Sequence, residues 1–324
     1  MSRRMRVVRF FADRHPAGLH ELIRARLPDT FDVREVSYSS SAQAQVEAVE
    51  WAEVMLLTPA RTLAPEVVAA GRHLRLVQVW SSGVDKFNWR DFAGLGVPVA
   101  NNGGANADTV AEHTVMLMLT TLRNLPNQLR LTETGDWRGN MHGLDSRTLR
   151  GRRVGLLGFG AIGRRVGILA HAFGADCMFH DTDPTIDGSG VARRVDPDQL
   201  LLESEVLSLH LHLDASTRGI IDAGAISRMP SGAVLINVSR AELVDQRALA
   251  SALDEGHLSA AGVDVFTVEP NDPADPIVLH PRSVATPHYA ASVDGFQAMM
   301  TACIENIVRV MVGDPPLHLV TESR

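Results

Sequence analysis

The sequence has little cysteine and no large excess of charge of either sign. Its 324 residues include two cysteines, Cys177 and Cys303, which both lie in apolar segments. This placement predicts buried, reduced thiols rather than a disulfide framework, and nothing around them supports metal ligation. A formal net charge of −7 offers no broad attraction to nucleic acid or anionic lipid. We therefore expect no bound metal, no nucleic-acid partner and no membrane partner.

Long hydrophobic runs are also missing. No uninterrupted apolar stretch approaches the roughly 20 residues needed to cross a bilayer. The basic start, 1–6, leads into only a short apolar segment before Asp13, so it lacks the core of a signal peptide. We expect a cytoplasmic location. A hydrophobic fraction of 45% and a charged fraction of 21% are typical of globular proteins, and the length predicts two domains.

The first hundred residues alternate between β-like runs and helix-compatible segments. This alternation predicts βαβ units and a parallel sheet of the flavodoxin-like kind. Helices are expected at Ala17–Leu27 and Ala64–Arg72. The expected strands are Met5–Phe11, Phe31–Tyr38, Val54–Thr58, Leu74–Trp80 and Val97–Asn101.

An apolar helix at Asn106–Leu122 is then expected to cross into a second domain. Six more short apolar runs follow, separated by helical patterns, and they predict a Rossmann-type doubly wound parallel sheet. These runs are Val154–Leu157, Cys177–Phe179, Val206–Leu211, Ala233–Val238, Gly262–Val265 and Val284–Ala285. The last helix, Phe296–Val312, is expected to pack on the first domain. We therefore predict a discontinuous substrate-binding domain, 1–101 and 292–324, and a dinucleotide-binding domain, 102–291.

A glycine-rich turn joins the first strand of the second domain to its first helix. Such a turn seats a dinucleotide, because its backbone approaches the pyrophosphate and the helix N-terminus meets the phosphate charge. Asp181 follows the last glycine at close to the roughly 20-residue offset expected for the carboxylate that bonds the adenosine ribose. Asp181 would repel a 2′-phosphate, so NAD (NADH) is the expected cofactor. Arg193 and Arg194 could reach a 2′-phosphate, so NADP remains the less favoured alternative. The residues expected to bind the cofactor here are Gly158, Gly160, Ala161, Ile162, Gly163 and Asp181.

Three further residues each follow a predicted strand, where ligands bind in doubly wound folds. Arg240 can hold a carboxylate in a planar, two-pronged contact while it polarises the adjacent carbonyl. Glu269 and His288 suggest a carboxylate beside an imidazole, which favours the protonated ring and makes it a general acid. His113, by contrast, lies in a helical stretch and is interpreted as structural. Arg240, Glu269 and His288 are thus the candidate catalytic residues, and the chemistry that they suggest is hydride transfer.

These residues lie in segments that resemble the D-isomer-specific 2-hydroxyacid dehydrogenases, and the similarity spans nearly the whole chain. The resemblance implies that Arg240 binds the substrate, that His288 is the acid/base and that Glu269 keeps His288 protonated. It also implies that Asp264 contacts the nicotinamide amide and that the Ser82-Gly83 turn brings backbone N–H groups to the substrate carboxylate. The matching segments are 155–163, 237–240, 262–266 with Glu269-Pro270, 286–288, 82–85 and 106–113.

The resemblance further implies a homodimer joined through the cofactor domains, with much of the contact expected in the segment from Leu122 to Gly143, including Trp137. The expected reaction interconverts a small 2-oxo acid and a D-2-hydroxy acid, with glyoxylate, hydroxypyruvate or a pyruvate analogue as substrate. Phosphoglycerate is less favoured, because no obvious phosphate-binding cluster accompanies Ser82-Gly83. Trp80, just before this turn, either narrows the substrate pocket or packs under the loop.

Two other functions are compatible with parts of this pattern. The first is an NAD-sensing protein that uses the same fold for partner binding, as the related corepressors do. These corepressors also keep the arginine, the glutamate and the histidine. The second is a formate dehydrogenase, which Glu269 argues against because that family carries glutamine at this position.

Overall fold

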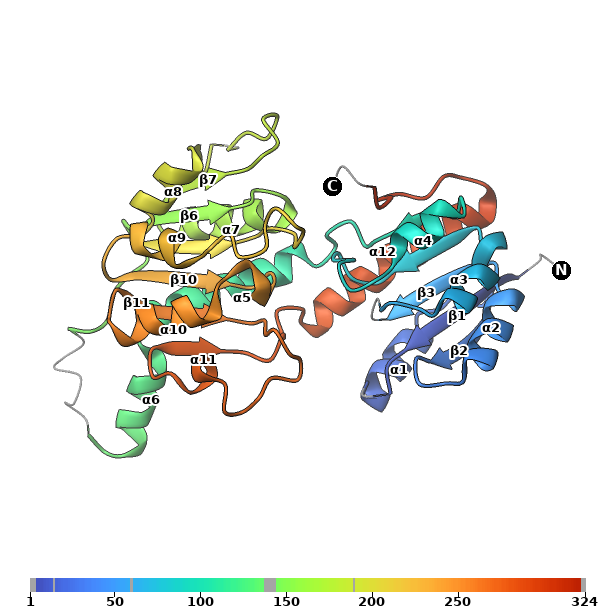
Figure 1. The fold of residues 1–324 in the computed structure, drawn as a ribbon, viewed down its shortest axis with the longest axis horizontal. Coiled ribbons are helices and arrows are strands. Elements are labelled where there is room, and N and C mark those ends of the chain that lie inside the picture. The colour runs from blue at the N-terminus through green and yellow to red at the C-terminus, as the bar shows by residue number, and fades with distance from the viewer. Residues whose placement is uncertain (1–3, 14, 59–60, 137–143, 189, 322–324) are drawn as a thin grey trace. The chain divides into compact units, whose positions relative to one another are not determined.

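The computed structural model describes the chain except for residues 1–3, 14, 59–60, 137–143, 189 and 322–324. The chain divides into two compact units, Met1–Asn106 with Val293–Arg324, and Ala107–Ser292. Each unit is built around one sheet in which every neighbouring pair of strands is parallel (Figure 1). The expectation of two doubly wound parallel-sheet domains is therefore confirmed.

The first unit has the strand order β2-β1-β3-β4-β5, which is the flavodoxin-like order. Its strands are β1 (Met5–Phe11), β2 (Phe31–Ser37), β3 (Val54–Thr58), β4 (Leu76–Val79) and β5 (Val99–Ala100). Its helices are α1 (Ala17–Arg24), α2 (Ala42–Trp51), α3 (Pro65–Ala70), η1 (Gly71–His73), α4 (Trp89–Gly94) and α12 (Val293–Val312). β4 and β5 are shorter than expected.

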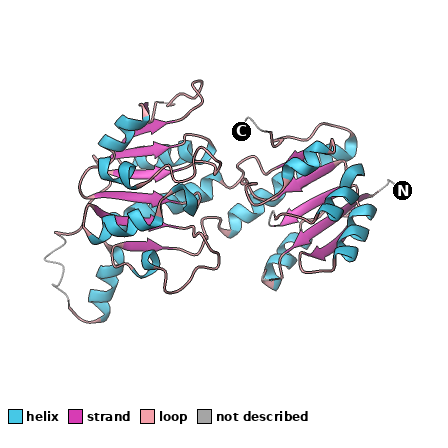
Figure 2. Ribbon diagram, in the orientation of Figure 1, coloured by secondary structure: helices cyan, strands magenta, loops and turns pink. Residues whose placement is uncertain are grey.

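Helices cover both faces of this sheet (Figure 2). On one face, apolar side chains of the central strands pack against α2, α3 and α4. The cluster includes Phe10 and Leu57 from the strands, and Val49, Val67 and Phe92 from the helices. α12 packs against β4, where the buried Asn306 donates from Nδ2 to Gln78 Oε1 at 2.9 Å. The last helix of the chain therefore belongs to the same unit as the first strands.

The second unit has the strand order β12-β11-β10-β9-β6-β7-β8. Its strands are β6 (Arg153–Leu157), β7 (Asp176–His180), β8 (Arg193–Arg194), β9 (Val206–Leu209), β10 (Ala233–Asn237), β11 (Leu258–Val263) and β12 (Ser283–Ala285). The six-strand expectation is thus corrected to seven by β8. β11 begins earlier than expected and ends at Val263, so Asp264 belongs to the loop beyond it.

Two hydrophobic clusters hold the helices of the second unit on opposite faces of its sheet (Figure 2). β6 and β10 are almost entirely buried because both of their faces are covered. One cluster contains side chains of α5 and α7, and the other contains side chains of α8, α9 and α10. The helices are α5 (Ala107–Leu122), α6 (Leu125–Glu133), α7 (Ala161–Ala172), α8 (Pro197–Glu203), α9 (Ala223–Arg228), η2 (Ala241–Leu243), α10 (Gln246–Asp254) and α11 (Pro276–Leu279).

Cys177 and Cys303 are both buried and unbridged, as expected. Among the residues that the structure describes, no helix is long and apolar enough to cross a membrane. Within the same residues, no group of three or more His, Cys, Asp and Glu side chains could hold a metal ion.

Candidate active site

At two positions of the glycine turn between β6 and α7, any residue larger than glycine would collide with the backbone. Gly158 has a φ of 91°, a backbone conformation that side chains disfavour. A Cβ added there would lie 2.6 Å from the carbonyl oxygen of His210, and one added at Gly163 would lie 2.3 Å from the carbonyl oxygen of Gly158. Both contacts are with backbone, which cannot move away cheaply. These glycines therefore let α7 and the loop after β9 close on the turn.

Gly160 is different, because a Cβ built there would meet no described atom within 4 Å. Gly160 is the N-cap of α7 and, without a side chain, it forms no side-chain capping hydrogen bond. The backbone N–H groups of Ala161 and Ile162 lie in the first turn of this helix, where N–H groups lack partners within the helix. Protein packing does not require glycine at this position, so the open space fits the close approach of a pyrophosphate to these N–H groups.

Asp181 lies directly after β7, beside this turn. Its carboxylate accepts hydrogen bonds from the N–H of Phe159 at 2.7 Å and from the N–H of Asp183 at 3.0 Å. β7 is the sheet neighbour of β6, so the strand order brings Asp181 to the glycine turn. The residues present therefore fit a dinucleotide with free adenosine ribose hydroxyls.

The two arginines near this carboxylate are held by protein groups. Arg194 donates to the backbone carbonyls of Asp181, Asp183 and Ile186 at 2.6–2.7 Å. Arg193 forms an ion pair with Glu203 at 2.6 Å. Arg194 thus fixes the loop that carries Asp181, and Arg193 points to the neighbouring helix.

Arg240 follows β10 and is fixed by a local network of hydrogen bonds. Asn237 Nδ2 donates to the carbonyl oxygen of Arg240 at 2.8 Å, and the Ser239 hydroxyl donates to the carbonyl oxygen of Leu209 at 2.7 Å. Arg240 Nη1 donates to the carbonyl oxygen of Ser239 at 2.8 Å. Arg240 is therefore held at an ordered strand end, at the edge of the sheet that also carries the glycine turn.

Glu269 and His288, which lie on loops after the adjacent strands β11 and β12, are in direct contact. His288 Nδ1 lies 2.8 Å from Glu269 Oε1. The His288 side chain is 47% exposed and the Glu269 side chain 19% exposed, so the imidazole is accessible while the carboxylate is largely covered. His288 has a φ of 55°, an uncommon backbone conformation that marks functional positions in many proteins. The strand order β12-β11-β10 places Arg240, Glu269 and His288 on three neighbouring loops.

Asp264 is also in this region, but its side chain is 0% exposed. Its Oδ1 accepts from the Thr286 hydroxyl at 2.6 Å and from the N–H of Tyr289 at 2.8 Å, and its Oδ2 accepts from the N–H of Ala290 at 3.0 Å. Burial opposes ionisation of this carboxyl, yet hydrogen bonds from His113, Thr286 and Tyr289 lower its pKa below the ordinary value. Asp264 is therefore an ionised group that organises the loop around His288.

His113 completes this network, and the sequence interpretation did not connect it with the site. His113 Nε2 lies 3.0 Å from Thr286 Oγ1 and 3.4 Å from Asp264 Oδ1. More than 150 residues separate His113 from both partners along the chain, so no local pattern announces the contact. The resemblance segment that contains His113 was the available signal.

In the first unit, the Ser82-Gly83 turn is tied to the segment 101–106. Ser82 Oγ lies 2.7 Å from Asn102 Oδ1 and 3.0 Å from Asn106 Oδ1, and Asn101 Nδ2 donates to the carbonyl oxygen of Ser82 at 2.8 Å. Trp80 is 6% exposed and packs edge-on against Phe296 of α12, with ring centroids 6.0 Å apart. The Trp80 side chain is therefore buried against α12.

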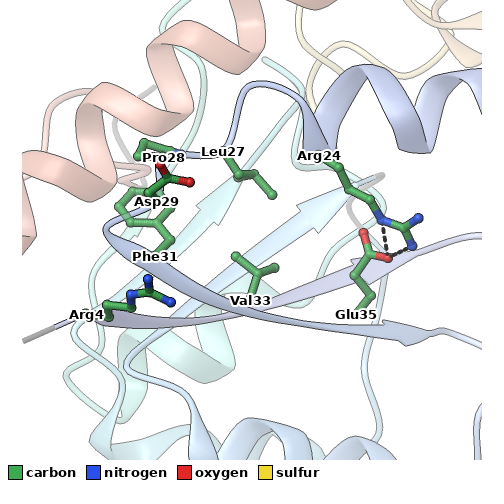
Figure 3. Close-up of a pocket in the computed structure, with 8 residues that line it drawn as sticks. All are labelled: Arg4, Arg24, Leu27, Pro28, Asp29, Phe31, Val33 and Glu35. Atoms are coloured by element: carbon green, nitrogen blue, oxygen red, sulfur yellow. Dashed lines mark hydrogen bonds and ion pairs between the residues drawn. The ribbon is translucent and has the colours of Figure 1, made fainter.

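Two surface cavities lie away from these residues. One, of about 320 Å³, lies beside the edge strand β2. There the guanidinium of Arg24 and the carboxylate of Glu35 pair with each other (Figure 3). The other, of about 380 Å³, lies at the amino ends of β6 and β10 and includes Arg147, Arg153 and Glu205. Their linings contain none of the candidate site residues, so neither cavity is the candidate active site.

Comparison with known proteins agrees with the geometry. The model of the NAD-binding domain of D-isomer-specific 2-hydroxyacid dehydrogenases matches residues 115–290. A glyoxylate reductase of Thermofilum pendens is 31% identical over 264 residues, which cover 80% of this chain and 78% of that protein. A hydroxypyruvate reductase of Thermotoga maritima is 34% identical over 245 residues, which cover 74% of this chain and 78% of that protein.

A D-3-phosphoglycerate dehydrogenase of Archaeoglobus fulgidus is 30% identical over 88% of this chain, which spans only 54% of that protein. The crystal structure of an NAD complex of a D-isomer specific 2-hydroxyacid dehydrogenase from Lactobacillus delbrueckii ssp. bulgaricus matches 98% of this chain and 100% of that chain, with a TM-score of 0.81 and 23% identity. At this identity the likeness shows the fold alone. The family match and the more similar relatives show that the chain belongs to the D-isomer-specific 2-hydroxyacid dehydrogenases, which are NAD-dependent oxidoreductases.

Proposed function

We propose that the protein uses NADH to reduce a small 2-oxo acid, such as glyoxylate or hydroxypyruvate, to a D-2-hydroxy acid. The observation that carries this proposal is the 2.8 Å contact between Glu269 and His288, at the edge of the sheet that also holds the glycine turn. Relatives named glyoxylate reductase and hydroxypyruvate reductase support this substrate class. NADP is less favoured, because Asp181 lies at the turn and both nearby arginines are bonded to protein groups.

His288 is proposed as the general acid. Its Nδ1 faces Glu269, so a protonated ring donates its Nδ1 hydrogen to that carboxylate and presents its Nε2 hydrogen outward. When bound, NADH supplies the hydride for the carbonyl carbon of the substrate. His288 then gives its Nε2 proton to the carbonyl oxygen, which becomes the hydroxyl group, and takes this proton back in the reverse reaction.

Substrate positioning is proposed for Arg240 and for the Ser82-Gly83 turn. The Arg240 guanidinium would grip the carboxylate in two parallel hydrogen bonds and polarise the adjacent carbonyl. Substrate binding by backbone N–H groups of the Ser82-Gly83 turn is proposed from the family resemblance. The first unit would thus supply the substrate domain, and the second unit would supply the cofactor domain. Contact of Asp264 with the nicotinamide amide is part of the proposal, although the Asp264 side chain is buried in the structure.

A cytoplasmic homodimer joined through the cofactor domains is also part of the proposal. α6 supports it, because this helix exposes apolar side chains, with Leu125 at 41% and Leu129 at 55% exposure. Solitary exposed leucines are common, but two at helical spacing on one short helix favour a buried contact. Trp137 and the rest of the expected contact segment up to Gly143 lie outside the described residues.

The direct test is a screen of NADH and NADPH oxidation across 2-oxo acids of increasing side-chain size. We expect turnover with NADH and with the smallest acids. Turnover of formate with NAD, without turnover of any 2-oxo acid, would favour formate dehydrogenase chemistry. If NADH binds but no acid is reduced, a dinucleotide-sensing role in partner binding becomes the better account.

A further inference from the structure

A buried hydrogen-bond network connects α5 to the loop that carries His288. It begins at His113, whose Nε2 lies 3.0 Å from Thr286 Oγ1 and 3.4 Å from Asp264 Oδ1. The Thr286 hydroxyl donates to Asp264 Oδ1 at 2.6 Å. Because the Thr286 hydroxyl donates its hydrogen to the carboxylate, its oxygen is the acceptor in the contact with His113. A neutral His113 ring therefore carries its proton on Nε2.

The other end of the network holds the backbone immediately after His288. Asp264 accepts the N–H of Tyr289 at 2.8 Å and the N–H of Ala290 at 3.0 Å. Before His288, the N–H of Thr286 donates to the carbonyl oxygen of Val263 at 2.9 Å, and His288 itself donates to the carbonyl oxygen of Thr286 at 2.9 Å. The backbone is therefore anchored on both sides of a residue with a φ of 55°.

This anchoring matters because the His288 side chain has little support of its own. It is 47% exposed, and its imidazole contacts Glu269 through Nδ1. A half-exposed ring on a loop can meet both a carboxylate and a substrate oxygen only if its backbone is fixed, since small misplacements of a catalytic group cost large factors in rate.

We propose that His113 is a positioning residue for the acid/base His288. His113 fixes the carboxylate of Asp264 and the hydroxyl of Thr286, and Asp264 in turn fixes the two peptide groups that follow His288. His113 itself contacts neither substrate nor the reacting atoms in this account. The role in catalysis rests on the proposed function, whereas the effect on the loop does not depend on it.

The test replaces His113 by leucine, which removes the donor, and by glutamine, whose side-chain amide can restore it. The matched control is His257→Leu, because His257 is also partly buried in the second unit and its Nε2 lies 2.9 Å from a backbone carbonyl, that of Ile226. Thr286→Val removes the bridging hydroxyl with little change of volume and serves as the second variant if His113→Leu does not fold. Two quantities are measured: turnover, and hydrogen exchange of the peptide that contains Tyr289 and Ala290.

In the His113→Leu protein we expect kcat to fall by about ten- to a hundredfold, the size of effect typical of residues that orient a functional group. Exchange at Tyr289 and Ala290 should accelerate by about tenfold or more, because the Asp264 carboxylate that accepts their N–H groups loses its contact with His113 and is held less firmly. His113→Gln should recover part of both quantities, and Thr286→Val should resemble His113→Leu.

Equal losses in the His113→Leu and His257→Leu proteins would indicate general destabilisation and would overturn the proposal. Unchanged exchange at Tyr289 and Ala290 would overturn it as well. If the unmodified protein turns over no 2-oxo acid, the proposed function fails, and the exchange measurement still decides whether His113 holds the loop.

Discussion

Alanine at Gly160 should mainly weaken cofactor binding, whereas alanine at Gly163 should mainly lower the stability of the fold. A Cβ at Gly160 meets no described atom within 4 Å, whereas a Cβ at Gly163 would lie 2.3 Å from the carbonyl oxygen of Gly158. Gly160 has a φ of −72° and a ψ of −156°, close to the extended region that alanine also adopts. The turn therefore contains one glycine that packing requires and another that only a ligand would require.

The sizes of the two effects follow from these contacts. Overpacking at Gly163 costs about 3 kcal/mol, the upper end of the usual range, because the added Cβ would lie 2.3 Å from a backbone oxygen. The better helix propensity of alanine returns about 1 kcal/mol, so a net loss of about 2 kcal/mol remains. Alanine at Gly160 should lower the free energy of unfolding by about 0.5–1 kcal/mol, less than at Gly163, because alanine is a poorer N-cap than glycine. Its methyl group would hold the pyrophosphate away from the backbone N–H groups, and losing one charged hydrogen bond, about 1.5–3 kcal/mol, raises the Kd for NADH about ten- to a hundredfold.

Urea unfolding and a fluorescence titration with NADH measure the two quantities separately. Gly18→Ala is the matched control, because Gly18 lies in α1 and an added Cβ there also meets no described atom within 4 Å. This control should bind NADH normally. Normal NADH binding by the Gly160→Ala protein would refute the assignment of the turn to the cofactor, and undiminished stability of the Gly163→Ala protein would refute the packing argument.

Three further predictions concern other parts of the chain. Arg240→Lys keeps the charge but loses the planar two-pronged contact, so steady-state kinetics should show kcat/KM for the 2-oxo acid falling by about tenfold or more. Burial lowers the pKa of His210 from 6.5 to about 3. The unfolded chain therefore binds a proton that the folded chain refuses, and stability should fall as the pH drops from 6.5 towards 3. Urea titrations should show a smaller fall for His210→Asn between pH 7 and 5, and an equal fall would contradict this. Leu129→Glu should shift the protein from dimer to monomer in light scattering, and an unchanged mass would argue against α6 as the contact.

The sheets and the contact between Glu269 and His288 were predictable because their signals are local. Strands buried on both faces leave continuous apolar runs, and β1 and β3 have the expected bounds. Glu269 and His288 could be paired in advance because each follows a strand, and adjacent strands end at the same edge of a parallel sheet.

Other features depend on tertiary contacts that leave no local pattern. β8 consists of two exposed arginines at the edge of its sheet, so it has no apolar run to reveal it. Ser259 and the small side chains of Ala260 and Ala261 hid the first half of β11, since β-branched and aromatic residues carry the strand signal. The contact of His113 with Asp264 joins a helix to a loop far away in the chain, and only the folded structure brings the two together.

The most direct test of the central claim is NADH oxidation by a His288→Asn protein that still binds NADH with the affinity of the unmodified protein. If His288 delivers the proton, kcat with the best 2-oxo acid should fall by about 10²–10⁴-fold, the usual contribution of a general acid. Glu269→Gln should give a smaller loss, because the imidazole remains but its Nδ1 loses the carboxylate partner. Undiminished turnover in the His288→Asn protein would contradict the account.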